Sequence, residues 1–227
     1  MSEPIPAHFH RDAPQDAHQR RRHRAVLALL RTLPPGPVLD YGFGWGDIAW
    51  AARATHPDIV GVDVEQRRVD FARAQYAPIR FERCRPDGLD FPDASFDIVL
   101  SVVVLPFVPD DHAYLREIRR VLRPGGHLVL ASKTSPPITR WWRRLSGRRE
   151  QDRHPAPGIR HHDAGDAAAL LEAHGFTILE RRAFYDPPFE ARKNPADLAN
   201  GVLQLVGERL GLIAPAPYPL FLARRTD

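Results

Sequence analysis

Short apolar runs alternate with helical stretches between residues 36 and 131, and this alternation predicts the fold class. The apolar runs that predict buried strands end at Leu39 and occupy residues 59–63, 96–104 and 127–131. Stretches with helical spacing separate these runs, at residues 48–54, 65–76 and 114–122. Because strands that alternate with helices form parallel sheets with right-handed crossovers, the sequence predicts an α/β fold.

The pattern is less regular on both sides of this region. Residues 18–33 predict a helix with a basic start, which Pro34 and Pro35 end. Residues 132–160 interrupt the alternation, which resumes with a helix at 164–174, a strand at 176–182, a helix at 195–212 and a short strand at 220–224. We expect a flexible N-terminal segment over residues 1–17 and a single domain over residues 18–227.

Three alternating glycines follow the first predicted strand, in the sequence VLDYGFGWGDI from Val38 to Ile48. Gly42, Gly44 and Gly46 permit positive φ angles and allow a ligand to approach the backbone closely. The helix that follows directs its free N–H groups to the same place, which suits an anionic group. The spacing predicts a nucleotide-binding turn, although a dinucleotide-type loop carries its third glycine one position later. The alternative is a turn that only packs a helix on a strand.

Asp63 ends the second predicted strand, 21 positions after Gly42. An acid about 20 residues beyond such a glycine loop is typically placed to accept hydrogen bonds from the hydroxyl groups of a ribose. The alternative role is the N-cap of the helix that begins directly afterwards. Because the glycine loop and the acid occur together, the pair favours ribose binding.

Four blocks of sequence, VLDYGFGWG, VGVDVE, FPDASFDIVLS and LREIRRVLRPGGHLVL, carry a family resemblance. In their order and spacing over residues 36–133 they resemble the class I S-adenosylmethionine-dependent methyltransferases. The branch that they resemble most is methyltransferase type 11, the ubiquinone/menaquinone-type small-molecule branch. The resemblance implies a Rossmann-like three-layer sandwich, with a seven-stranded, mostly parallel sheet whose last strand is antiparallel. It also implies a cofactor-binding half over residues 36–133 and an acceptor-side insertion and C-terminal part over residues 134–227.

The resemblance implies S-adenosyl-L-methionine as the cofactor and assigns roles to individual positions. Val64 would pack against adenine, and Ser101, in the apolar run over residues 96–104, would line the methyl-transfer pocket. The family usually has an acid before the third block, contacting the adenine amino group, where this chain has Arg85. Asp87, two positions later, is the expected substitute. The remaining positions that would hold the methionine and ribose parts are Asp40, Gly42, Phe43, Gly44, Gly46 and Asp63.

Methyl transfer is an in-line displacement at a sulfonium methyl group, and the protein mainly supplies proximity and alignment. A general base is needed only when the acceptor must lose a proton. The candidates for such a base are His8, His10, His112, His161, His162 and Tyr185. For His161 and His162 the alternative is a solvated turn before a helix that Asp163 caps. We expect no metal site there, because adjacent side chains diverge and no fourth ligand is evident.

Composition narrows the possible partners and location. The 227 residues have a formal net charge of +4 and a sequence pI near 9.6, and nearly all of the positive charge is on arginine. Because arginine, proline, alanine and histidine are abundant together, we attribute the basic pI to coding bias and expect no nucleic-acid partner. Cys84 is the single cysteine, the N-terminus lacks an apolar signal core, and the longest apolar run is too short for a membrane span. We therefore expect a cytoplasmic protein.

Trp141 and Trp142 stand among arginines in the segment that interrupts the alternation. They have three possible roles: packing on the core, covering an acceptor pocket, or weak contact with an anionic membrane surface.

The sequence thus predicts an S-adenosylmethionine-dependent methyltransferase that acts on a small-molecule or lipid-like acceptor. The alternatives are a protein of the same fold that binds without activity and a nicotinamide-dependent oxidoreductase. The glycine spacing and the FPDASFD and RPGGHLVL blocks argue against the oxidoreductase.

Overall fold

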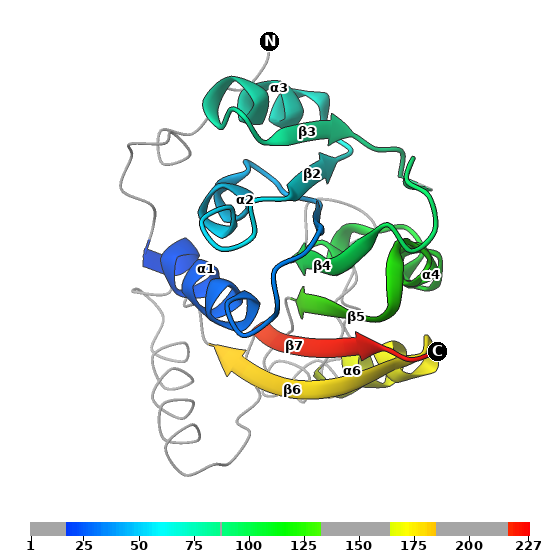
Figure 1. Ribbon diagram of the computed structural model, residues 1–227. Coiled ribbons are helices and arrows are strands. Elements are labelled where there is room, and N and C mark those ends of the chain that lie inside the picture. The colour runs from blue at the N-terminus through cyan, green and yellow to red at the C-terminus, as the bar shows by residue number, and fades with distance from the viewer. Residues whose placement is uncertain (1–16, 87, 133–163, 185–217) are drawn as a thin grey trace, which may run out of the picture.

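The computed structural model describes residues 17–86, 88–132, 164–184 and 218–227. These residues form one twisted sheet and the helices that pack on it (Figure 1). The strands lie in the order β3-β2-β1-β4-β5-β7-β6. Pairing is parallel from β3 to β5, and β7 is antiparallel to both of its neighbours. The strands are β1 (Val38–Tyr41), β2 (Ile59–Asp63), β3 (Arg80–Arg83), β4 (Phe96–Val102), β5 (Leu122–Ala131), β6 (Phe176–Phe184) and β7 (Tyr218–Arg225).

Helices cover both faces of this sheet and make it the middle of three layers (Figure 1). The first three helices pack on one face, and α4 and α6 pack on the other. The predicted architecture, a seven-stranded and mostly parallel sheet with an antiparallel last strand, is therefore confirmed. The helices are α1 (Ala17–Leu30), α2 (Asp47–Ala52), α3 (Gln66–Gln75), α4 (Asp111–Val121) and α6 (Ala164–Ala173), with a short 3₁₀ helix η2 (Leu105–Phe107) after β4.

Strand β1 shows how the alternation of side chains divides the two layers. Leu39 and Tyr41 belong to the core on the side of α4 and α6, whereas Val38 belongs to the core on the side of α1. Successive side chains of a strand point to opposite faces, so Asp40 faces the same side as Val38. Each fully buried leucine or valine contributes about 1.5–3 kcal/mol, which makes these two layers the main source of stability. Asp40 is the polar exception within an otherwise apolar strand.

Strands β3, β4 and β5 differ from the sequence prediction in ways that have a physical reason, and several other elements begin or end two or three residues from the predicted positions. β3 was not predicted, because Phe81 is its one buried residue in four, and charged residues occupy the other three positions. β4 ends at Val102, two residues early, since Val103 adopts a φ of 60° and turns the chain into η2. β5 begins at Leu122, directly after α4, although we expected a turn at residues 123–126 before the strand.

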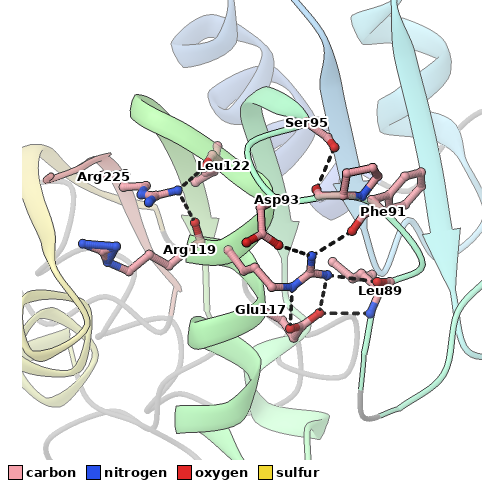
Figure 2. Close-up of polar contacts among 10 residues, drawn as sticks. Leu89, Phe91, Asp93, Ser95, Glu117, Arg119, Leu122 and Arg225 are labelled. Atoms are coloured by element: carbon pink, nitrogen blue, oxygen red, sulfur yellow. Dashed lines mark hydrogen bonds and ion pairs between the residues drawn. The ribbon is translucent and has the colours of Figure 1, made fainter.

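Arg120 of α4 holds the connection into β4. Figure 2 shows the residues that it contacts: Leu89, Phe91, Asp93 and Glu117. Arg120 donates to the carbonyl oxygens of Leu89 (3.0 Å) and Phe91 (2.8 Å), and it forms ion pairs with Glu117 and Asp93. Glu117 in turn accepts from the backbone N–H of Leu89 at 3.1 Å. Hydrogen bonds from Glu117 and Asp93 raise the pKa of Arg120, and the bonds that Glu117 accepts lower the pKa of that carboxyl. This network holds the chain before β4 in place.

Candidate functional site

A cavity of about 660 Å³ opens at the carboxyl ends of β1, β2 and β4. In open parallel sheets this edge is where ligands bind, in the crevice beyond the ends of the strands. The lining comes from the loop after β1, the residues after β2, the chain leaving β4, and α1. Its size is that of a typical small-molecule site.

The glycine loop forms the floor of the cavity at the end of β1. Gly42, Gly44 and Gly46 all have positive φ, at 78°, 63° and 92°, as the alternating pattern predicted. A Cβ atom at Gly42 would lie 2.4 Å from Val104, and one at Gly46 would lie 3.0 Å from Tyr76. A Cβ at Gly44 would meet nothing within 4 Å. Gly44 is therefore the glycine next to open space, and the other two permit close packing.

Asp63 fixes the shape of this loop from the end of β2. Its Oδ2 accepts from the backbone N–H of Gly44 at 3.0 Å, and its Oδ1 accepts from Glu65 at 3.0 Å. Arg68 lies 3.4 Å from Oδ2 as an ion-pair partner. Asp63 is only 3% exposed, yet it lines the cavity. The structure thus places Asp63, the acid predicted to bind the ribose, in direct contact with the predicted glycine loop. The alternative role of Asp63 is not observed, because the N-cap of α3 is Glu65.

Asp40 lines the same cavity from within β1 and is 1% exposed. Its Oδ2 is buried and has no hydrogen-bond partner among the described residues. Burial, and after it the nearby charge of Asp63, raises the pKa of Asp40 to about 7. A buried carboxyl without a partner is costly, so it marks a position where a ligand group can complete the bonding.

Phe43 combines two roles in the glycine loop. It contributes to the cavity lining, while its ring packs on Phe81 with the centroids 4.7 Å apart. Gly61 in β2 makes room for both rings, because a Cβ there would lie 2.6 Å from Phe81 and 2.9 Å from Phe43. A phenylalanine fits between two loop glycines because the neighbouring strand carries a glycine of its own.

The chain leaving β4 forms an apolar wall of the cavity. Val103, Val104, Phe107 and Val108 all line the cavity, and Phe107 is 59% exposed. A β-branched residue at positive φ, as at Val103, is strained, and such strain gathers at ligand-binding sites. The sequence prediction did not include these residues, because the continuous apolar run suggested a longer strand.

Ser101 lies behind this wall and does not line the cavity itself. It is fully buried, and its hydroxyl lies 3.0 Å from the hydroxyl of Tyr114, which does line the cavity. Burial raises the pKa of Tyr114 well above its usual value, and Tyr41 packs on it with ring centroids 4.6 Å apart. Tyr114 therefore stays protonated and presents a hydroxyl at the position where Ser101 was expected.

The adenine side of the site is described in part. Val64, 46% exposed, and Pro86 both line the cavity. Arg85 is exposed and forms an ion pair with Asp90 at 3.3 Å, on the surface. Asp87, the expected substitute for an adenine-binding acid, lies outside the described residues.

Most of the candidate bases lie outside the described residues as well: His8, His10, His161, His162 and Tyr185. His112 is described, at the start of α4, and its Nδ1 lies 2.8 Å from Nε2 of His174 on the surface. Trp141 and Trp142 also lie outside the described residues.

Helix α1 contributes two further lining residues that the sequence prediction missed, Arg22 and His23. Their signal in the sequence is positional. Arg22 is four residues before the buried Val26, so a charged residue continues the apolar face of the helix.

Comparison with known proteins gives consistent results for this region. A family described as a methyltransferase domain matches residues 39–130. The demethylmenaquinone methyltransferase of Tropheryma whipplei (strain Twist) is 35% identical over 126 residues, which are 54% of this chain and 51% of that protein. The phthiotriol/phenolphthiotriol dimycocerosates methyltransferase of Mycobacterium leprae (strain TN) is 31% identical over 135 residues, 57% of this chain and 49% of that protein.

Solved structures extend the likeness in fold to nearly the whole chain. The 1,6-didemethyltoxoflavin-N1-methyltransferase of Burkholderia thailandensis, with 1,6-didemethyltoxoflavin and S-adenosylhomocysteine bound, has a TM-score of 0.61 and 21% identity. The match covers 95% of this chain and 93% of that one. By contrast, the chain spans about half the length of the curated relatives it matches. The region that matches the methyltransferase domain, residues 39–130, includes the glycine loop and Asp63, which line the cavity.

Proposed function

We propose that this protein is an enzyme that transfers the methyl group of S-adenosyl-L-methionine to a small, largely apolar or lipid-like acceptor. The observation that carries the proposal is a single cavity that joins the glycine loop and Asp63 to the apolar wall after β4. The bound cofactor supplies a sulfonium methyl group with an excellent leaving group. The residues of the chain then have to hold the two reactants in line and exclude water.

Asp63 would bind the ribose. An ionised carboxylate has about four lone-pair sites, and the two backbone N–H donors occupy two of them. The other two would accept from the ribose hydroxyl groups, which would displace the 3.4 Å contact with Arg68. The same two N–H bonds fix the orientation of the carboxylate before the ligand arrives, which lowers the entropic cost of binding. Val64 and Pro86, which both line the cavity, would pack against adenine.

The acceptor would lie against the wall formed by Val103, Val104, Phe107 and Val108. This wall offers apolar contact, and Tyr114, which carries a hydroxyl group, lines the same cavity. The relatives are named for demethylmenaquinone and for phthiotriol dimycocerosates, which are lipid-like. An exposed phenylalanine at the cavity mouth suits the same kind of molecule, because it leaves apolar surface for the acceptor to cover.

Several finer points stay predictions. A base at His161, His162 or Tyr185 would be needed only for an acceptor that loses a proton. Contact of Trp141 and Trp142 with an anionic membrane surface, and a cytoplasmic location, are also untested. Among the helices of the described residues, none has the length and apolar character needed to cross a bilayer.

Calorimetry with the full chain tests the proposal first at the cofactor. We expect binding of S-adenosylhomocysteine and none of NAD, and the reverse result would establish the oxidoreductase instead. Radiolabelled S-adenosylmethionine with a prenylated hydroquinone then tests transfer, with the same hydroquinone lacking the prenyl tail as the control. We expect faster transfer to the prenylated compound. Binding without transfer to any member of such a series would favour a binding protein.

A further inference from the structure

The buried face of α1 carries a charge where it reaches the cavity. Val26, Leu29 and Leu30 are fully buried and pack the helix against the sheet. Arg22 is four residues before Val26 and seven before Leu29, so it lies on the same face, one turn beyond the core. Its side chain lines the cavity, and its Nε is buried without a hydrogen-bond partner among the described residues. Burial of a charged guanidinium group without a partner costs desolvation free energy, and a bound anion would offset that cost.

Asp40 presents the opposite charge to the same cavity. Its side chain faces the α1 side of the sheet, and its Oδ2 is also buried without a partner among the described residues. The two groups therefore line one cavity without satisfying each other. A cavity that keeps a cationic and an anionic group apart is suited to a ligand with both charges, such as the ammonium and carboxylate of an α-amino acid.

The other basic side chains of the described lining are either paired with carboxylates or uncharged. Arg68 forms ion pairs with Asp63 and Glu65. His23 is 8% exposed, and burial lowers its pKa to about 3, so it is neutral at physiological pH. Within the described part of the chain, Arg22 is the lining cation that remains for an anionic ligand group.

We propose that Arg22 binds the carboxylate of the methionyl end of the cofactor, with Asp40 facing the ammonium group of that end. The identity of the ligand rests on the proposed function. Arg22 lies in α1, outside residues 39–130, which match the methyltransferase domain. Helix α1 would therefore complete the cofactor site of that region. A guanidinium can donate two parallel hydrogen bonds to a carboxylate, which gives direction as well as attraction.

Calorimetry with two ligands and two variants tests the role of Arg22. S-Adenosylhomocysteine carries the amino-acid end, and 5′-methylthioadenosine lacks it. We expect Arg22→Met to weaken S-adenosylhomocysteine by about ten- to hundredfold, the usual worth of a charge-assisted hydrogen bond, and to leave 5′-methylthioadenosine within about twofold. Arg24→Met is the matched control, because Arg24 is exposed on the same helix and does not line the cavity. It should leave both affinities unchanged.

A second measurement needs no variant. Decarboxylated S-adenosylhomocysteine keeps the ammonium group, and the wild-type protein should bind it as weakly as Arg22→Met binds the complete ligand. The proposal is overturned if Arg22→Met binds S-adenosylhomocysteine normally, or if it weakens both ligands equally, which would indicate a structural role. In either case normal binding by the wild type leaves the proposed function standing. If the wild type binds neither ligand, the proposed function itself fails, and this inference fails with it.

Discussion

Strands β1 and β2 each present a buried carboxyl group to the same cavity, and the two groups differ in their hydrogen bonding. Asp63, at the end of β2, accepts two backbone N–H bonds and pairs with Arg68. Asp40, in β1, has an Oδ2 without any partner among the described residues. Both side chains are almost fully buried, at 3% and 1% exposed. The difference between them therefore comes from bonding, not from access to water.

This contrast separates two ways of building a binding site. The bonds of Asp63 preserve the loop geometry whether or not a ligand is present, so its role includes holding Gly44 in place. Asp40 contributes little to the fold and is destabilising when charged, because burial and the charge of Asp63 both oppose its ionisation. Groups of this kind are retained at functional sites, where a ligand supplies the missing partner.

Substitution of Gly44 should have the largest effect, because this residue joins Asp63 to the cavity. Gly44→Val places a β-branched side chain at a φ of 63° and fills the open space beside the loop. We expect no detectable binding of S-adenosylhomocysteine by calorimetry. Gly125→Val is the matched control, since Gly125 has a φ of 76°, has nothing within 4 Å, and lies outside the cavity lining. It should carry similar backbone strain and bind normally. Normal binding by a folded Gly44→Val would show that the loop is only structural.

Asp63→Ala should have the next largest effect. It removes two charge-assisted hydrogen bonds to the ribose, each worth roughly 1.5–3 kcal/mol, so affinity for S-adenosylhomocysteine should fall about a hundredfold or more. It should also lower the melting temperature, because the N–H groups of Gly44 and Glu65 lose their acceptor. Asp97→Ala, which breaks an exposed ion pair with Arg123, serves as the control and should change neither quantity much. An intact affinity in folded Asp63→Ala would exclude the ribose role.

The sequence predicted the glycine loop and Asp63 well, because both are marked by short stretches of the sequence itself. Glycines at alternating positions indicate positive φ angles, and a strand that ends in an acid is visible in the pattern itself. The parallel pairing of the strands follows from the alternation of strands and helices. The number of strands came only from the family resemblance, since β3 has a single buried residue and no apolar run.

The remaining parts of the site depend on tertiary structure and left weak signals. Tyr114 reaches the cavity because β4 and α4 pack together, and nothing in the sequence near it marks that position. The turn at Val103 is hidden within an apolar run that reads as a continuous strand. Arg22 had a signal, a charge on the buried face of α1, but only the packing of that helix gives it a functional meaning.

The smallest expected effect is on Asp40, and it depends on pH. The pKa of Asp40 is about 7 in the folded protein, against 3.8 for the ordinary side chain. Between these values the folded protein retains a proton that the unfolded chain has released, so this group's contribution to stability decreases as pH rises from about 4 to 7. Asp40→Asn removes that decrease. Its melting temperature relative to wild type should therefore rise with pH and level off above pH 7, and calorimetric melts at pH 5 and pH 8 measure the difference.

Binding should change in the opposite direction from stability in the same variant. The ligand ammonium favours ionised Asp40, so wild-type affinity for S-adenosylhomocysteine should rise from pH 5 to pH 8, with proton release near pH 7. Asp40→Asn should bind about tenfold more weakly at pH 8, nearly equally at pH 5, and without this pH dependence. Two other groups of the described lining titrate outside this range, because burial lowers the pKa of His23 to about 3 and raises that of Cys84 to about 11. If Asp40→Asn kept the wild-type pH dependence of binding, another group would face the ammonium, and Asp40 would differ from Asp63 in stability alone.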